Sequence, residues 1–135
     1  MERLNDRLAV AEKAHATLEE ALRIKNPTKL ERDGAIQRFE YTFEACWKTC
    51  QQYLHVVEGR ECASPKSCLR GIGEAGILNA EETSAALRMT DDRNRTVHLY
   101  HEALAEEIYA HLPAHSRLIG KILRGIRIRM SSACA

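Results

Sequence analysis

Hydrophobic residues recur at steps of three and four along most of the chain, a spacing typical of amphipathic helices. The first such stretch begins near the N-terminus and carries Leu4, Leu8, Ala11, His15, Leu18 and Leu22. It predicts a helix of about six turns. This helix should end at Asn26-Pro27, because proline disfavours the helical conformation in the residue before it.

The second stretch has the clearest pattern and should form the centre of the core. One helical face carries Ile36, Phe39, Phe43, Cys46, Trp47, Cys50, Leu54 and Val57, and Gly59 follows where a left-handed cap is expected. This helix holds both phenylalanines and the only tryptophan of the chain. Its two cysteines are therefore expected to be small core residues.

Two further helices are indicated by their start signals. Ser64-Pro65 predicts a short helix to about Ala75-Gly76, since serine caps a helix and proline fits its first turn. Asn79, with Glu82 three residues later, predicts a capping box. The helix that follows is expected to run from Ala80 to about Asp92.

A fifth helix is expected to begin within residues 93–98 and to carry Val97, Tyr100, Leu104 and Ile108. Pro113 should break it, which leaves a last helix around Leu118, Ile119, Ile122, Leu123 and Ile126. No strand pattern and no repeat is present. The sequence therefore predicts an all-α, antiparallel up-and-down bundle of five to six helices with a four-helix core, as a single domain over residues 1–135.

Charge is unevenly distributed along the chain. Residues 108–135 contain five basic and no acidic residues, whereas residues 1–107 contain 15 basic and 19 acidic residues, a net charge of −4. A basic C-terminal segment beside an acidic body favours an acidic or phosphate-bearing partner. An ordinary solvated helix face is the alternative interpretation.

The composition also bears on location and redox chemistry. The opening MERLNDRLAV lacks the apolar core of a secretory signal, and no run reaches the ~18 apolar residues of a spanning helix, so a cytoplasmic protein without a membrane segment is expected. The five cysteines are Cys46, Cys50, Cys62, Cys68 and Cys134. An odd number argues against a disulfide framework, and the lack of a Cys-x-x-Cys pair argues against a zinc site.

The stretch DDRNRTVHLYHE, residues 91–102, concentrates candidate chemistry. His98 can exchange a proton near neutral pH, Arg93 can hold a phosphate, and Asn94 can orient either group. These residue types suffice to cleave RNA without a metal. Arg93 and His98 would point about 140° apart on a continuous helix, so they converge only if the helix bends near Asn94 or if a second copy supplies one of them. In the alternative, His98 simply pairs with a polar neighbour on the surface.

Tyr100 and the histidines allow further interpretations. Tyr100 shares an apolar stripe with Val97, so it either packs or exposes its hydroxyl beside Arg93 and His98. Two histidines three residues apart, His98 and His101, suggest a metal, but only Glu102 lies near them as a third ligand.

The remaining histidine pair is not expected to form a metal site. His111 and His115 straddle Pro113 and are not expected to share a regular helix. No metal site and no cofactor is therefore predicted.

The pattern Arg-Asn-x-x-x-His-x-Tyr, formed by Arg93, Asn94, His98 and Tyr100, resembles the signature of the HEPN superfamily (higher eukaryotes and prokaryotes nucleotide-binding). More narrowly, the chain resembles the nucleotidyltransferase substrate-binding protein family. The stretches QRFEYTFEACWKTCQQYL (37–54), SPKSCLRGIGEAGIL (64–78) and MTDDRNRTVHLYHEALAEEIY (89–109) carry this resemblance in the right order.

The resemblance implies a HEPN-like helical bundle that forms a homodimer and works with a separate minimal nucleotidyltransferase encoded nearby. In one interpretation the chain is the nucleotide- or substrate-binding subunit of that pair, with Arg93, Asn94 and His98 contacting nucleotide or RNA. In related toxin–antitoxin pairs the HEPN protein is a metal-independent RNase. The resemblance then makes Arg93 and His98 catalytic, and Tyr100 the acceptor of an AMP group that silences the toxin.

The chain is not expected to be the nucleotidyltransferase itself. Such enzymes need a Gly-Ser loop and spaced aspartates for Mg²⁺, whereas this chain has no Gly-Ser dipeptide and only Asp6, Asp33, Asp91 and Asp92. Beside the motif, Arg95 either strengthens a phosphate contact or pairs with Asp91, four residues earlier.

Overall fold

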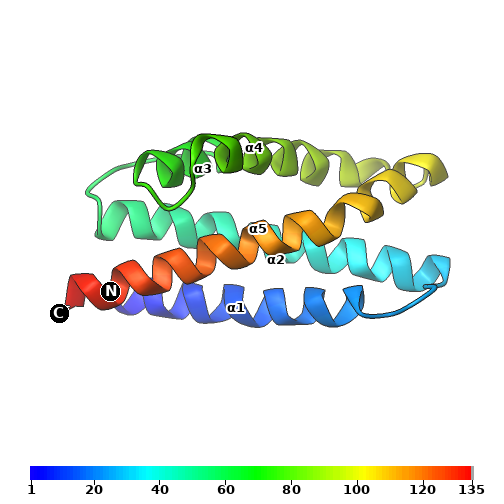
Figure 1. Ribbon diagram of the computed structural model, residues 1–135, viewed down its shortest axis with the longest axis horizontal. Helices are drawn as coiled ribbons and strands as arrows, with labels where there is room; N and C mark the ends of the chain where they lie inside the picture. The colour runs from blue at the N-terminus through cyan, green and yellow to red at the C-terminus, as the bar shows by residue number, and fades with distance from the viewer. Residues whose placement is uncertain (135) are drawn as a thin grey trace.

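The protein is an all-α bundle, as the sequence predicts (Figure 1). A computed structural model describes the backbone of residues 1–134 and the side chains of residues 1–132. The side chain of Cys134 therefore lies outside the described part. Its elements are α1 (Glu2–Leu22), α2 (Lys29–Val56), α3 (Pro65–Glu74), α4 (Ala80–Arg95), the 3-10 turn η1 (Thr96–His98) and α5 (Glu102–Cys134).

The four long helices α1, α2, α4 and α5 alternate in direction (Figure 1). The short α3 lies beside α2 and the start of α4. Both termini lie at one end of the bundle, and the chain reverses from α4 into α5 at the other end. The reversal carries η1, so residues 93–100 lie at the end of the bundle away from the termini.

Three helices begin with a reciprocal capping box. Thr28 and Glu31 cap α2, Ser64 caps α3, and Asn79 with Glu82 caps α4, which confirms the predicted starts of α3 and α4. The α2 helix ends at Val56, and Gly59 follows with a φ of 66°. Glycine adopts this left-handed conformation without steric cost.

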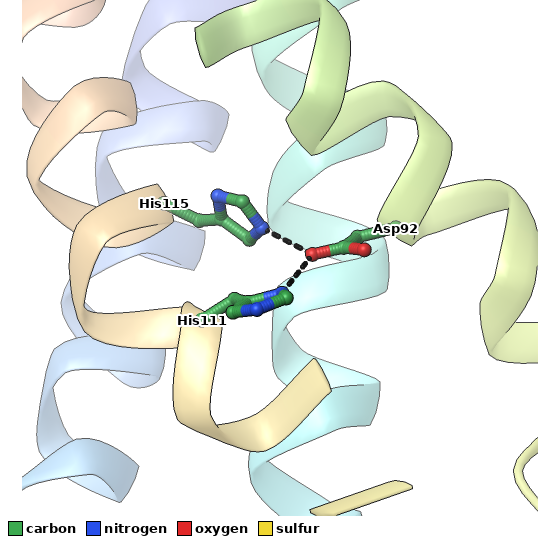
Figure 2. A group of neighbouring side chains, drawn as sticks. All are labelled: Asp92, His111 and His115. Atoms are coloured by element: carbon green, nitrogen blue, oxygen red, sulfur yellow. Dashed lines mark hydrogen bonds and ion pairs between the residues drawn. The ribbon is translucent and has the colours of Figure 1, made fainter. Parts of the chain in front are cut away.

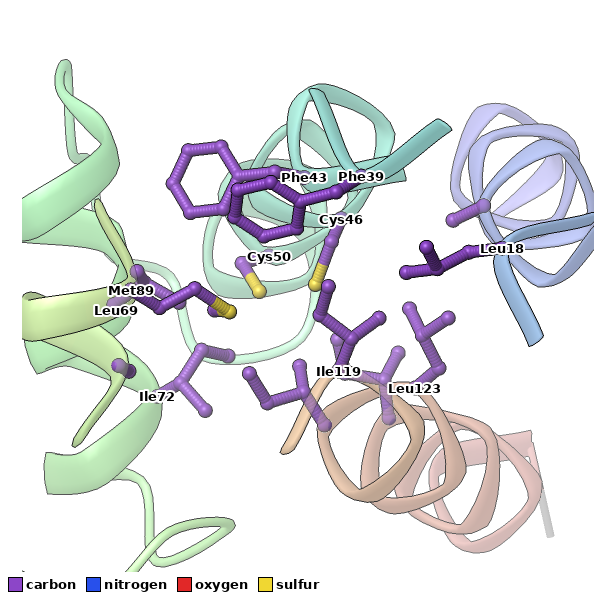
Figure 3. Packing of buried hydrophobic residues seen from close by; sticks show 14 of the residues in the cluster. Leu18, Phe39, Phe43, Cys46, Cys50, Leu69, Ile72, Met89, Ile119 and Leu123 are labelled. Atoms are coloured by element: carbon purple, nitrogen blue, oxygen red, sulfur yellow. The ribbon is translucent and has the colours of Figure 1, made fainter. Parts of the chain in front are cut away.

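The core is centred on α2, as its pattern predicts (Figure 3). Phe39, Phe43, Cys46 and Cys50 of this helix are fully buried or nearly so. They meet residues from every other helix, including Leu18, Leu69, Ile72, Met89, Ile119 and Leu123. Burying each large apolar side chain stabilises the fold by about 1.5–3 kcal/mol.

The start of the last helix differs from the prediction. Helix α4 continues to Arg95, η1 follows, and α5 begins only at Glu102. Val97 is 68% exposed and Tyr100 is 75% exposed, so the apolar stripe predicted through both is wrong, and Tyr100 follows the exposed alternative. Both lie in the reversal between two helices, where the helical period that would bury them no longer applies.

The predicted break at Pro113 is also wrong, because α5 runs through it without interruption. A proline inside a helix costs about 3 kcal/mol, since it removes one backbone hydrogen bond and crowds the preceding turn. Buried residues on both sides of Pro113, namely Ile108, Leu112, Ile119 and Ile122, offset this cost by continuing one apolar face.

A disulfide joins Cys62 to Cys68, contrary to the expectation that the cysteines form none. The two Cα atoms lie 5.3 Å apart because the chain turns from the loop before α3 into its first turn. Cys46 and Cys50 are buried thiols, as predicted. None of the described helices is long and apolar enough to cross a membrane.

Candidate functional site

Arg93 lies in the last turn of α4 and is oriented toward α2. Its Nη1 donates a hydrogen bond to Oγ1 of Thr96 at 3.2 Å, and its Nε lies 3.6 Å from Oε1 of Glu44. That separation is too long for a hydrogen bond, and Nε is buried without a partner. The Arg93 side chain is still 23% exposed. Its guanidinium is therefore held in place and keeps N–H groups that have no acceptor among the described residues.

His98 and Tyr100 form a contact at the exposed end of the bundle. Nδ1 of His98 lies 3.1 Å from the Tyr100 hydroxyl, and the two rings meet edge to face. Tyr100 also packs against His101, with ring centroids 4.5 Å apart. The hydroxyl of Tyr100 is thus presented to solvent beside an imidazole.

The sequence motif is therefore only partly assembled within one chain. The structure brings His98 together with Tyr100, whereas Arg93 lies with Thr96 and Glu44. Among the described residues, no hydrogen bond or ion pair joins Arg93 to His98. Asn94 is exposed beside them on α4.

An ion pair between a buried arginine and an exposed glutamate fixes the start of α5 next to this motif. Arg32 of α2 is 7% exposed and bonds to Glu102, the first residue of α5, and to Asp33. The hydrogen bond and charge of Glu102 raise the pKa of Arg32 above its ordinary value. Arg32 likewise lowers the pKa of Glu102, so the pair is charged at neutral pH.

A second polar cluster lies between α4 and α5 (Figure 2). Oδ2 of Asp92 accepts from Nδ1 of His111 at 2.8 Å and from Nε2 of His115 at 2.7 Å. Oδ1 accepts from Arg95 at 2.6 Å, and Arg95 also pairs with Glu107. Arg95 therefore pairs with Asp92 rather than with Asp91.

Burial and hydrogen bonding act in opposite directions on this cluster. Burial raises the pKa of Asp92, but hydrogen bonds from His115, Arg95 and His111 outweigh it, and the net pKa lies below the ordinary value. Burial lowers the pKa of His115 more than Asp92 raises it. The cluster therefore pairs an ionised carboxylate with an uncharged His115, whose ring stacks on Phe39.

A groove of about 790 Å³ opens beside the cluster, between α4 and α5. Asp92, His111 and His115 lie along it with five cationic residues, Arg88, Arg95, Arg117, Lys121 and Arg124. Lys121 is paired with Glu82 across the groove. The basic C-terminal residues thus lie partly on this groove, next to the α4 helix that carries Arg93.

Sequence reasoning missed the Asp92 cluster because Pro113 was expected to separate His111 from His115. The two histidines are four residues apart on one uninterrupted helix and share a face. The four-residue spacing of His111 and His115 was the signal in the sequence that could have indicated this cluster. The acidic partner comes from another helix, and nothing in the local sequence of α5 indicates it.

Comparison with known proteins agrees with this fold. The profile of the family described as nucleotidyltransferase substrate binding protein like matches residues 6–126. A crystal structure of a Thermus thermophilus protein is 52% identical, with a TM-score of 0.84 over 87% of this chain and 98% of that one. No protein with a curated description matches the chain.

Two more distant structures share the fold. One is HI0074 from Haemophilus influenzae, described as the fold of a substrate binding domain of a nucleotidyltransferase. It is 23% identical, with a TM-score of 0.76 over 89% of this chain and 98% of that one. The other, from a toxin–antitoxin structure with AMP-PNP, is 10% identical, with a TM-score of 0.67 over 91% of this chain and 96% of that one. With the family profile spanning nearly the whole sequence, the chain belongs to the nucleotidyltransferase substrate-binding protein-like family.

Proposed function

We propose that this protein is the nucleotide- or substrate-binding subunit of a separate minimal nucleotidyltransferase, in a two-protein, toxin–antitoxin-like system of the HEPN type. The observation that carries the proposal is the family match over residues 6–126, which includes the Arg93, Asn94 and His98 motif. The chain itself lacks the Gly-Ser loop that a nucleotidyltransferase needs. The transfer chemistry therefore belongs to the partner.

The local geometry supports a binding role for the motif. The Nε of Arg93 is buried without a hydrogen-bond partner, which is costly unless a ligand or a small movement satisfies it. A phosphate can accept from a guanidinium through two parallel hydrogen bonds. Asn94 and His98 are exposed nearby and offer further donors to the same ligand.

A partner surface is consistent with the exposed apolar residues near the motif. Val97 and Tyr100 lie in the helical reversal, and Leu30, 83% exposed, lies in the first turn of α2. The Arg32–Glu102 pair joins the beginnings of α2 and α5, so Leu30 belongs to the same end of the bundle. A second copy docked there would form the proposed homodimer and could bring its His98 to Arg93.

The binding role is tested with AMP and ATP as probe ligands. We expect the purified chain, alone or with its transferase, to bind one of them, and Arg93→Ala to weaken binding by at least about tenfold, the effect of losing 1.4 kcal/mol of phosphate contact. Arg70→Ala, an exposed arginine on α3, is the matched control. Equal affinities for wild type and Arg93→Ala would contradict the assignment of this residue.

A second candidate is a metal-independent RNase toxin whose active site combines Arg93 and His98 across the proposed dimer. The exposed Tyr100 hydroxyl is consistent with the AMP transfer that would silence it. His98 would remove the proton of a ribose 2′-hydroxyl, which attacks the adjacent phosphorus. The bond to the 5′-oxygen then breaks, giving a cyclic phosphate and a 5′-hydroxyl. Silencing would follow when the Tyr100 oxygen attacks the α-phosphorus of ATP on the transferase, with release of pyrophosphate and a proton.

Two measurements separate this candidate from the binding subunit. Purified protein is incubated with mixed RNA in excess EDTA, beside His98→Ala and a matched single-stranded DNA, which lacks the 2′-hydroxyl. Cleavage of RNA alone that His98→Ala abolishes supports the RNase. An intact RNA pool with folded protein rejects it. For the modification, co-expression with the transferase should add one AMP mass that Tyr100→Phe prevents.

A further inference from the structure

Asp92, His111 and His115 bring three ligand atoms of a kind that binds metals to one point. The two imidazole nitrogens and the carboxylate oxygen all lie within 4.8 Å of one another (Figure 2). We propose that these three residues bind a single divalent transition-metal ion of the zinc type. This inference does not depend on the proposed function, because none of its ligands is Arg93, Asn94 or His98.

The arrangement on the helices matches what such an ion requires. His111 and His115 lie four residues apart on α5 and project from one face, the spacing that lets two histidines share a zinc ion on a helix. Asp92 approaches from α4 on the opposite side. Three protein ligands leave one of the four tetrahedral positions for water or another ligand.

The carboxylate is already oriented for this role. Arg95 holds Oδ1 of Asp92 at 2.6 Å and is itself held by Glu107 at 2.6 Å. Oδ2 is thereby left to face both imidazoles. Metal-binding carboxylates are commonly fixed by such outer hydrogen bonds, which orient the ligand and raise affinity.

The distances from Asp92 to the two histidines are close to those of a metal-bound cluster. Zinc–ligand bonds of about 2.0–2.2 Å place tetrahedral ligand atoms roughly 3.3 Å apart. The corresponding distances to Oδ2 are now 2.8 Å from His111 and 2.7 Å from His115. The ring protons would move to Nε2 of His111 and Nδ1 of His115, and the His111 side chain, 47% exposed, has room to turn.

The donor set also selects the class of ion. Two imidazoles and one carboxylate suit Zn²⁺, Co²⁺, Ni²⁺ or Cu²⁺, whereas Mg²⁺ and Ca²⁺ prefer sites built from oxygen atoms. His111 lies on the groove between α4 and α5, so the fourth position faces that groove. The ion would connect α4 to α5 one residue away from Arg93.

The test uses the tag-free full chain, cleared of metal with EDTA and then titrated with Co²⁺ and Zn²⁺. We expect one equivalent of Co²⁺ to give the visible absorption of a low-coordinate site, and Zn²⁺ to abolish it. His111→Ala should remove this absorption while the protein stays folded, because the His111 side chain is largely exposed. Arg95→Ala should weaken Zn²⁺ binding by about 10–100-fold, the usual effect of losing an outer hydrogen bond.

His55→Ala, on α2, is the control for an exposed histidine away from the cluster. His101→Ala tests the other histidine pair of the sequence, and both controls should bind Zn²⁺ as the wild type does. A folded wild-type chain that retains no ion would overturn the proposal. Equal binding by wild type and His111→Ala, or loss of binding in His101→Ala, would also overturn it.

Discussion

Arg32 is a buried cation with partners on two helices. It bonds to Asp33 within α2 and to Glu102 at the start of α5. Without Glu102, the buried Arg32 keeps only Asp33 as an acidic partner, so its charge is less well compensated. This ion pair therefore helps to position the reversal that carries His98 and Tyr100.

The Arg32–Glu102 pair makes stability depend on pH in a defined direction. The pKa of Glu102 is lowered below its ordinary value of 4.5 by Arg32. A lowered folded pKa gives stability that is present above the unfolded pKa and is lost as the pH falls through the folded pKa. We therefore expect Glu102→Gln to lower the thermal unfolding midpoint at pH 7 and to have little effect once the pH is well below 4.5.

The control for this prediction is Glu106→Gln, which removes an exposed carboxylate from the same helix. Unfolding midpoints of the three proteins are compared from pH 3 to pH 7. Glu106→Gln should follow the wild type throughout. A constant difference between Glu102→Gln and wild type at every pH would show that the charge of Glu102 is not what stabilises the protein.

At the scale of elements, the short helix α3 packs closely on the start of α4. A Cβ atom at Gly73 would lie 2.2 Å from Oγ1 and 3.2 Å from Cβ of Thr83. That approach is possible only without a side chain at position 73. The α3–α4 pair therefore depends on glycine for its spacing, in contrast to Gly34 in α2, which has nothing within 4 Å of its Cβ position.

Gly73→Ala should accordingly lower the free energy of unfolding by about 1–3 kcal/mol, the usual cost of overpacking. Gly34→Ala should instead raise it by about 0.5–1 kcal/mol, because alanine favours a helix interior. Adding Thr83→Ala to Gly73→Ala should recover part of the loss. Chemical denaturation of the wild type, the two glycine variants and the double variant measures these values. Equal stability of Gly73→Ala and Gly34→Ala would refute this explanation of the packing.

Of the three scales, the sequence predicted the helices best. Helical periodicity predicted α1 and α2, each of which has a continuous apolar face, and capping residues predicted the starts of α3 and α4. The boundary between α4 and α5 and the continuity across Pro113 were wrong. Both are decided by packing on the rest of the bundle, which a local pattern does not contain.

For the candidate site too, features set by local sequence were predicted, and features set by packing between helices were missed. The motif of Arg93, Asn94, His98 and Tyr100 was visible because its residues are close in sequence. The sequence also predicted that Arg93 and His98 diverge on a continuous helix, but not that α4 ends at Arg95 and that η1 then brings His98 to Tyr100 rather than to Arg93. The Asp92 cluster needed the contact between residues of two helices that lie 19 to 23 positions apart along the chain.

At the scale of the whole molecule, the bundle has one distinctive end. The reversal between α4 and α5 gathers the motif, the exposed Val97 and Tyr100, and the start of α2. Val97 and Tyr100 are exposed together beside the donor groups of the motif, which is consistent with an interaction surface. This end of the bundle is the surface we assign to a second copy, the transferase and the ligand.

We propose that this chain works as a subunit of a nucleotidyltransferase. The most direct measurement is co-expression with a minimal nucleotidyltransferase proposed as its partner, followed by size-exclusion chromatography with light scattering at micromolar concentration. We expect one peak that contains both proteins, with this chain present as a dimer. Separate elution of two folded, active proteins at that concentration would contradict it.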